Sequence, residues 1–242
     1  MIYVIAYDFG TTGVKACIFS IDKDVRMAVS AYGTYPLYLV ENGGVEQDAD
    51  EWWSTMCSTT REMFEKTDIT PDQIAGISFC SQMQGIVLVD REGNALRRPM
   101  SYMDQRGKKE FADCMGNGML KVAGCDVFKL VKSLLVSKAA SISVKDPVWK
   151  YKWVENNEPE IFAKVYKWLD VKDYLIGRCT GELVMTEDTA YATFLYDTRK
   201  GKEGWSRDLV RIYRIKPEHL PRVIGCAEEA GRLTQKAAAE LG

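Results

Sequence analysis

The chain has 242 residues, of which 46% are hydrophobic and 27% charged, a composition typical of a folded protein with a sizeable core. Its formal net charge of −2, with lysines and arginines scattered along the sequence, provides no basic stripe to bind nucleic acid or an anionic membrane. The start lacks the basic region of a signal peptide and no apolar run is long enough to span a bilayer, so we expect a cytoplasmic protein.

Strands and one helix are predicted in the first ninety residues. The strands are expected at residues 2–7, 14–20, 26–34, 74–80 and 86–89. The first is apolar on both alternating faces, which predicts a strand covered on both sides, and the first three form an antiparallel meander. Asp48 to Glu51 is a helix-capping pattern, followed by apolar residues at helical spacing as far as Phe64.

The rest of the chain is less regular. Three glycines interrupt residues 107–150, for which we expect only a mixture of helix and loop. Helices are predicted over residues 158–168, 172–178, 206–213 and 234–241. Three strands, a helix and further strands is the order of the ribonuclease-H-like fold of actin-type ATPases and sugar kinases. We therefore predict an α/β domain with a mixed sheet flanked by helices.

The seven cysteines and the single histidine exclude two kinds of chemistry. The cysteines contain no C-x-x-C pair, so we expect neither a disulfide framework nor a zinc site. Most of them lie in apolar runs, which is typical of buried, reduced thiols. His219 is the one histidine, which argues against histidine-based catalysis.

The first candidate site is the segment from Asp8 to Gly13. Asp8 ends a strand that is otherwise apolar, where an ionised carboxylate is costly unless a cation or hydrogen-bond donors meet it. Gly10, Thr11, Thr12 and Gly13 then offer backbone amides and two hydroxyls, which suit terminal phosphates, while Asp8 could hold Mg²⁺. A tight hairpin turn is an equally good interpretation of this segment alone. The sequence contains neither a Walker A loop nor a dinucleotide fingerprint.

Two further polar segments follow predicted strands. Residues 81–85 place Gln82 and Gln84 on a short connection, and residues 102–106 combine a carboxylate, an amide and a guanidinium. Such groups suit the neutral hydroxyls of a small polyol. Taken singly, each segment is more often an ordinary loop than a site.

Several motifs in order resemble the FGGY carbohydrate kinases, and xylulokinase-like members most of all. Asp8 to Thr12 resembles the family's first phosphate motif, and Gly43 to Asp48 with Trp53 resembles its Gly-x-x-Glu-x-Asp segment. Ser81-Gln82-Met83-Gln84-Gly85 is similar to the stretch that lines the sugar pocket. Tyr102-Met103-Asp104-Gln105-Arg106 is similar to Trp-x-Asp-x-Arg. The resemblance extends through residues 158–160, 172–175, 180–182 and 188–206.

The resemblance implies an ATP-dependent sugar kinase with Mg²⁺ as its metal. It assigns Mg²⁺ to Asp8 and the phosphates of ATP to the hairpin; for the sugar, the residues implied are Gln82, Met83, Gln84, Tyr102 and Asp104. Lys15 and Arg106 have weaker claims. The expected partners are a small sugar or polyol and the protein's own C-terminal kinase domain, with a homodimer as an open alternative.

Residues 1–242 correspond to the N-terminal domain of such a kinase. The resemblance implies that the general base lies in a Gly-Gly-x-Asp segment of the second half, which does not occur here, so this chain alone is predicted to be inactive. Ser81, Gln84 and Tyr102 depart from the residues usual in xylulokinases, so xylulose is only the leading substrate candidate. A non-catalytic sugar-binding or interaction module, and an ATPase of the actin or chaperone type, remain the alternatives.

Overall fold

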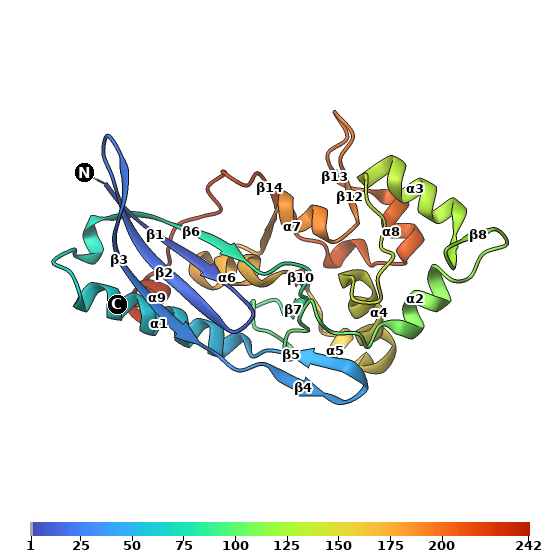
Figure 1. The fold of residues 1–242 in the computed structure, drawn as a ribbon, viewed down its shortest axis with the longest axis horizontal. Coiled ribbons are helices and arrows are strands. Elements are labelled where there is room, and N and C mark those ends of the chain that lie inside the picture. Colours follow the sequence, from blue (N-terminus) through green and yellow to red (C-terminus); the bar gives the residue numbers. More distant parts are fainter. Residues whose placement is uncertain (1) are drawn as a thin grey trace.

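This computed structural model, which describes residues 2–242, contains a four-stranded mixed sheet whose strands all lie within residues 2–81. Strands β1 (Ile2–Phe9), β2 (Gly13–Ile21) and β3 (Val25–Thr34) are antiparallel, as predicted. Strand β6 (Ile74–Ser81) lies parallel to β1 on its other side, which gives the order β3-β2-β1-β6 (Figure 1). The predicted mixed α/β architecture is confirmed.

The helices that pack on this sheet lie on one of its faces. They are α1 (Ala49–Glu65), α6 (Val171–Thr180) and α9 (Gln235–Leu241). Ile5, Tyr7 and Phe9 point into this layer and are buried, whereas Val4 and Ala6 on the opposite face are only half-buried. The prediction that the first strand is covered on both sides is therefore wrong for the part of the chain described here.

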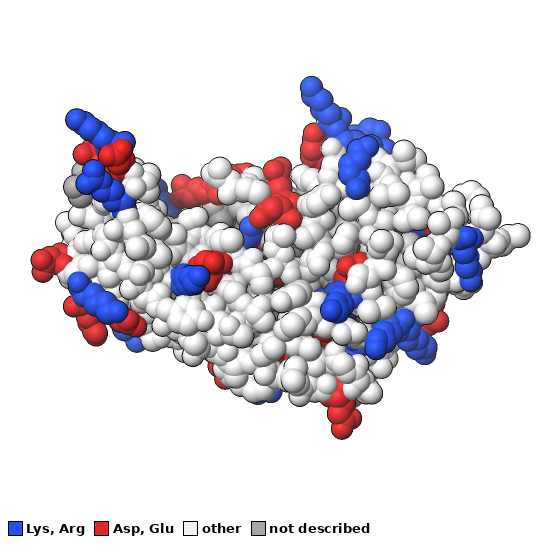
Figure 2. Space-filling view, viewed as in Figure 1, with Lys and Arg blue, Asp and Glu red and all other residues white. Residues whose placement is uncertain are grey.

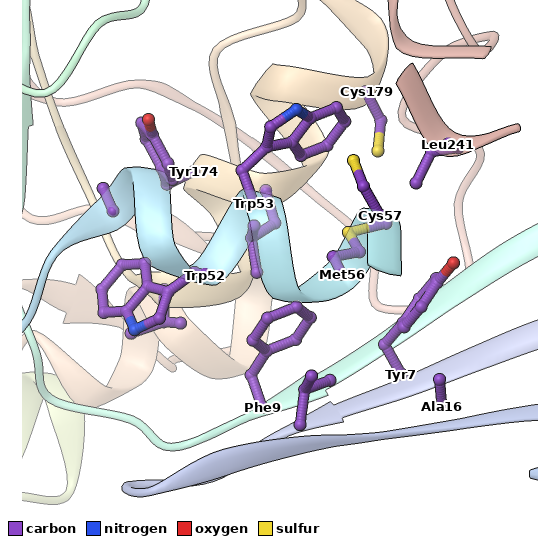
Figure 3. Close-up of a cluster of buried hydrophobic side chains, with 14 of the residues drawn as sticks. Tyr7, Phe9, Ala16, Trp52, Trp53, Met56, Cys57, Tyr174, Cys179 and Leu241 are labelled. Carbon is purple, nitrogen blue, oxygen red and sulfur yellow. The ribbon is translucent and has the colours of Figure 1, made fainter. Parts of the chain in front are cut away.

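Helix α1 supplies the centre of this core. Asp48 caps it by accepting a hydrogen bond from the Asp50 amide at 3.0 Å, as the capping pattern predicts. Trp52 and Met56 are essentially fully buried against the strand side chains (Figure 3). Because a buried Trp or Met contributes several kcal/mol of burial free energy, this one helix face anchors the sheet.

A second core, rich in aromatic residues, lies beside the sheet (Figure 1). Helices α4 (Pro147–Asn157) and α8 (Arg207–Tyr213) contribute most of its helical side chains, and α2 (Lys108–Cys114) and α3 (Val127–Ser137) pack at its edge. Trp149 packs edge-on against Tyr213 with ring centroids 5.5 Å apart, and Tyr151 stacks on Trp168 at 5.1 Å. The segment for which only helix and loop were expected therefore contains ordered helices, together with a short hairpin.

The predicted helix over residues 158–168 is wrong. Helix α5 (Pro159–Phe162) is a single turn, and β10 (Lys167–Leu169) follows it as a strand. This strand pairs antiparallel with β7 (Val87–Val89), and Trp168 is buried against Tyr151. Tertiary pairing thus overrides the local helical pattern. The predicted helices at 172–178, 206–213 and 234–241 are confirmed within a few residues.

The remaining elements are short. They are β4 (Tyr38–Val40), the 3-10 turns at Glu41–Gly43, Pro71–Gln73 and Pro217–His219, β5 (Gly44–Glu46), β8 (Lys121–Val122), β9 (Cys125–Asp126), β11 (Val184–Thr186), α7 (Glu187–Ala192), β12 (Tyr196–Asp197), β13 (Gly204–Trp205) and β14 (Arg222–Ile224). Strands β11 and β14 are parallel, whereas the pairs β4–β5, β8–β9 and β12–β13 are antiparallel. Within residues 2–242, no helix has the length and apolar character needed to cross a membrane.

The cysteines and surface charges refine the expectations from composition. All seven thiols are free, but Cys80 and Cys226 are exposed, so the expectation of mostly buried thiols is only partly right. Cys80 lies on the open side of strand β6, where no described element covers it. Charged side chains of both signs are interspersed on the face shown in Figure 2, without a continuous basic stripe.

Candidate functional site

The turn between β1 and β2 is tightly fixed. The Gly10 amide donates to the Gly13 carbonyl at 2.9 Å and closes the turn after the last strand pair, Phe9 with Val14. The buried Tyr35 hydroxyl contacts the carbonyl oxygens of Gly10 at 2.6 Å and of Gly13 at 3.1 Å. One phenol from the end of β3 therefore holds both ends of the turn.

Gly13 serves close packing in this turn. Neither it nor Gly10 adopts the left-handed backbone region. A Cβ atom at position 13 would lie 2.4 Å from the Gly33 carbonyl oxygen and 2.6 Å from the Tyr32 hydroxyl, so no larger residue fits without movement. The tight-turn interpretation and the phosphate interpretation are thus both compatible with the geometry, because a rigid turn is what phosphate binding requires.

The polar side chains of this turn are accessible. Asp8 and Thr12 are exposed, Thr11 is half-buried, and the exposed Lys15 lies directly opposite Asp8 in the antiparallel register. The argument that burial obliges Asp8 to find a cation is therefore wrong, because its carboxylate faces solvent on the open side of the sheet. What these side chains offer is a carboxylate and two hydroxyls beside one another on a fixed turn.

Gln47 connects two predicted site segments. They are the turn of residues 10–13, called the phosphate turn below, and the loop of residues 81–85, called the sugar loop. Gln47 Nε2 donates to the Thr11 carbonyl at 2.8 Å, and Gln47 Oε1 accepts from Gln82 Nε2 at 2.6 Å. The backbone N–H of Gln82 also donates to the Phe9 carbonyl at 2.7 Å, and Thr11 Oγ1 lies 3.5 Å from the Tyr102 hydroxyl. Four segments that are far apart in sequence therefore meet at one place.

Asp104 is fully buried and engaged with protein donors. Its carboxylate accepts from the Val45 amide at 2.9 Å and forms an ion pair with Arg106, whose Nη2 lies 2.7 Å away. Arg106 also pairs with Glu46 at 2.7 Å, and Glu46 pairs in turn with Arg97. These contacts tie β5 to the segment that carries Tyr102, so Asp104 fixes the position of this segment.

The sugar loop itself contains a residue with unusual backbone geometry. Gln84 has a φ of 65°, in the left-handed region that costs free energy for any residue other than glycine. Its amide donates to Asp170 Oδ2 at 2.9 Å, and its carbonyl accepts from Lys150 Nζ at 2.6 Å. Neighbouring Met83 is 44% exposed and lies open to solvent.

Four residues at this site had no role assigned from sequence: Tyr35, Gln47, Lys150 and Asp170. Gln47 stands inside the Gly43 to Asp48 motif, which could have identified it. Lys150 and Asp170 are buried ionisable residues in apolar stretches, a combination that can indicate a site. Burial raises the pKa of Asp170 to about 7, with the neighbouring Asp173 adding to the shift, and burial lowers the pKa of Lys150 to about 8.

The chain resembles known carbohydrate kinases along its whole length. The profile of the N-terminal domain of the FGGY family of carbohydrate kinases matches residues 3–242. The xylulose kinase of Staphylococcus xylosus is 27% identical over 242 residues, which are 100% of this chain and 47% of that protein. The glycerol kinase of Afipia carboxidovorans is 30% identical over 96% of this chain and 45% of its own length.

Solved structures share the fold of this chain. The ligand-bound xylulose kinase from Lactobacillus acidophilus superposes with a TM-score of 0.84 at 23% identity, over 100% of this chain and 46% of that chain. The chain thus spans about half the length of the relatives that it matches. It belongs to the FGGY family of carbohydrate kinases, and the matched region is their N-terminal domain.

Proposed function

We propose that this chain is the sugar-binding half of an ATP-dependent kinase that transfers the γ-phosphoryl group of ATP to a hydroxyl of a small sugar or polyol. The observation that carries this proposal is the link from Thr11 through Gln47 to Gln82, because it joins the turn of residues 10–13 to the loop of residues 81–85. We also propose that the sheet has the ribonuclease-H-like arrangement and that the protein is cytoplasmic.

The exposed turn is suited to hold the phosphates of MgATP. Mg²⁺ is commonly bound by one or two carboxylates together with phosphate oxygens and water. Asp8 supplies one exposed carboxylate, and among residues 2–242 no three His, Cys, Asp or Glu side chains converge into a protein-only metal site. Asp8 would hold Mg²⁺, while Thr11, Thr12 and Gly13 would bind phosphate. Gly10 would contribute by closing the turn, because its amide already donates to the Gly13 carbonyl.

The sugar would lie against the loop of Gln82, Met83 and Gln84, with Tyr102 beside it. Amide and phenol groups match neutral hydroxyls as both donors and acceptors. Asp104 would act through the segment that it fixes, because Arg106 and the Val45 amide already satisfy its carboxylate. A direct contact between Asp104 and the sugar would require this pairing to open.

The remaining machinery is proposed to lie outside these 242 residues. A second domain would bind the adenosine, and an aspartate there would deprotonate the attacking hydroxyl. Removing one wall of the site also removes the positioning on which phosphoryl transfer depends. Residues 1–242 alone should therefore show no ATP-dependent turnover, and steady ADP formation with any sugar would contradict this.

A pentulose such as xylulose is the leading substrate candidate. Relatives of similar identity are named xylulose, glycerol and gluconate kinases, so the substrate must be tested. Pentuloses, polyols, hexuloses and gluconate should be offered to the full-length protein with MgATP, and ADP release should be measured. We expect the highest kcat/KM with a pentulose. In Gln84→Ala the order of preference among sugars should change, whereas a uniform loss would refute a role for Gln84 in specificity.

A further inference from the structure

The backbone of Gln84 is held at both of its polar ends by buried ionisable side chains. The Asp170 carboxylate accepts from its N–H at 2.9 Å, and the Lys150 ammonium donates to its C=O at 2.6 Å. The side chains come from different helices, since Lys150 lies in α4 and Asp170 caps α6. Two elements outside the loop therefore fix the two peptide units that flank the Cα atom of Gln84.

Both side chains stand where charge is expensive. Lys150 is 0% exposed and Asp170 is 4% exposed. Among residues 2–242, no ion pair within 4 Å includes Lys150, and its ammonium donates to the Gln84 carbonyl. A buried ammonium is normally paired with a carboxylate, so its use on a backbone carbonyl calls for an explanation.

The backbone geometry of Gln84 supplies one. A left-handed glutamine persists only when its surroundings impose that conformation. The fit is close, because a Cβ atom on the adjacent Gly85 would lie 3.3 Å from Asp170 Oδ1. The direction in which the Gln84 side chain leaves the loop depends on these two peptide units, and Gln84 belongs to the proposed sugar site.

We propose that Lys150 and Asp170 are positioning residues for the sugar site: together they hold Gln84 in its left-handed conformation and thereby set sugar affinity. This inference rests on the proposed function. Both act through Gln84, so they should affect the KM for the sugar far more than the KM for ATP. The phosphate turn is held by a different side chain, Tyr35, which contacts the carbonyls of Gly10 and Gly13.

The two hydrogen bonds from Lys150 and Asp170 to the Gln84 backbone, called the clamp below, should also respond to pH. Lys150 is faced by Asp104, Asp170, Asp146 and Lys145, and Asp170 by Asp173 as well as Lys150. Burial brings the pKa of Asp170 up to about 7 and that of Lys150 down to about 8. The clamp with both groups charged is therefore most populated between these values, where the KM for the sugar should be lowest.

The test uses the full-length protein with the sugar that it phosphorylates best. Lys150→Met and Asp170→Leu should each raise the KM for that sugar by about 10- to 100-fold, the effect of losing a charge-assisted hydrogen bond. The KM for ATP should change by less than about twofold. Asp170→Asn keeps an acceptor but loses the charge, so it should raise the KM for the sugar by less than Asp170→Leu does, and the rise in KM below about pH 7 should disappear.

Matched controls separate positioning from general damage. Lys172→Met removes another buried lysine, which pairs with Asp188, and Asp126→Asn alters another helix cap, that of α3. Neither contacts Gln84, so neither should change the KM for the sugar. An unchanged sugar KM in Lys150→Met and Asp170→Leu, or equal increases for ATP and sugar, would overturn the inference. If Lys150→Met does not fold, the two Asp170 variants decide.

Hydrogen exchange makes the inference independent of activity. In the wild-type protein the Gln84 amide should be protected, and Asp170→Leu should remove that protection while the Asp126→Asn control keeps it. If no sugar is phosphorylated, the proposed function fails and this measurement alone judges the clamp. Equal protection in wild type and Asp170→Leu would refute it.

Discussion

The phosphate turn and the sugar loop lie side by side but are held by different kinds of interaction. The turn is fixed by neutral groups, with Tyr35 and Gln47 hydrogen-bonded to its carbonyls. The sugar loop and its neighbouring segment are fixed by buried charges, namely Asp104 with Arg106, and Lys150 and Asp170 on Gln84. Neutral contacts work at any pH, whereas buried charges are strong only when their partners are complete.

This difference is chemically reasonable. Phosphates bring their own charge to the turn, so fixed carboxylates behind it would repel them. A sugar is neutral, so charged groups can support its loop without opposing the ligand. We therefore expect damage in the sugar region to be larger and dependent on pH, and damage in the turn to be smaller and independent of pH.

Removal of Arg106 should give the largest effect. Arg106→Leu leaves Asp104 buried without its cation and weakens the neutralisation of Glu46, so the free energy of unfolding should fall by about 3–5 kcal/mol. Urea titration of the full-length protein measures this. The matched control is Arg26→Leu, whose exposed pair with Asp24 should contribute only about 0–1 kcal/mol. Adding Asp104→Asn to Arg106→Leu should restore part of the lost free energy of unfolding. A smaller loss in Arg106→Leu than in Arg26→Leu would contradict the role of Arg106 as the buried partner of Asp104.

The pH dependence of stability should come next in size. The folded-state pKa of Asp170 is raised to about 7, so between about pH 4 and pH 7 the folded protein binds more protons there than the unfolded chain. The free energy of unfolding should therefore fall as pH rises through this window, by an amount on the order of 2–4 kcal/mol. Asp173, with a pKa raised to about 6, acts in the same direction.

Lys150 has the opposite sign on the alkaline side. Its folded-state pKa is lowered to about 8, so above this value the unfolded chain binds more protons and stability should rise with pH. Urea titrations across the pH range measure these effects. In Asp170→Asn the free energy of unfolding should fall less between about pH 4 and pH 7 than in the wild type, whereas Asp126→Asn should leave this fall unchanged. If the free energy of unfolding falls equally steeply in Asp170→Asn and in the wild type, Asp170 is not the cause of this pH dependence.

The same contrast explains what could be predicted from the sequence. The turn is local, so Asp8 to Gly13 was identifiable, and the meander was predictable from three consecutive strand segments separated by short turns. The contacts that complete the site are not local: Gln47 meets Thr11 and Gln82, and Asp170 meets Gln84 across 86 positions. Spacing within a segment carries no information about such pairs. The exposure of Asp8 and the strand at Lys167–Leu169 were missed for the same reason.

Tyr35→Phe tests the neutral side of the comparison. It removes the hydroxyl that contacts the Gly10 and Gly13 carbonyls but keeps the ring that stacks on Phe9. A loss of about 1–2 kcal/mol is expected, because the Gly13 carbonyl still accepts from Gly10 and the turn lies near solvent. The KM for ATP should rise while that for the sugar stays constant. An increase confined to the KM for the sugar would show that Tyr35 acts on the sugar loop and not on the phosphate turn.

Gln47→Met should have the smallest effect on stability and the most informative effect on function. The substitution removes the amide that joins Thr11 to Gln82 without changing side-chain length, and each freed group is only partly buried, so a loss of about 1 kcal/mol is expected. Because Gln47 contacts both regions, the KM values for ATP and sugar should both rise. Neither increase should vary with pH, since no group in this link titrates. A pH-dependent increase would show that the turn, too, relies on the buried charges, and the two regions would then form one electrostatic unit.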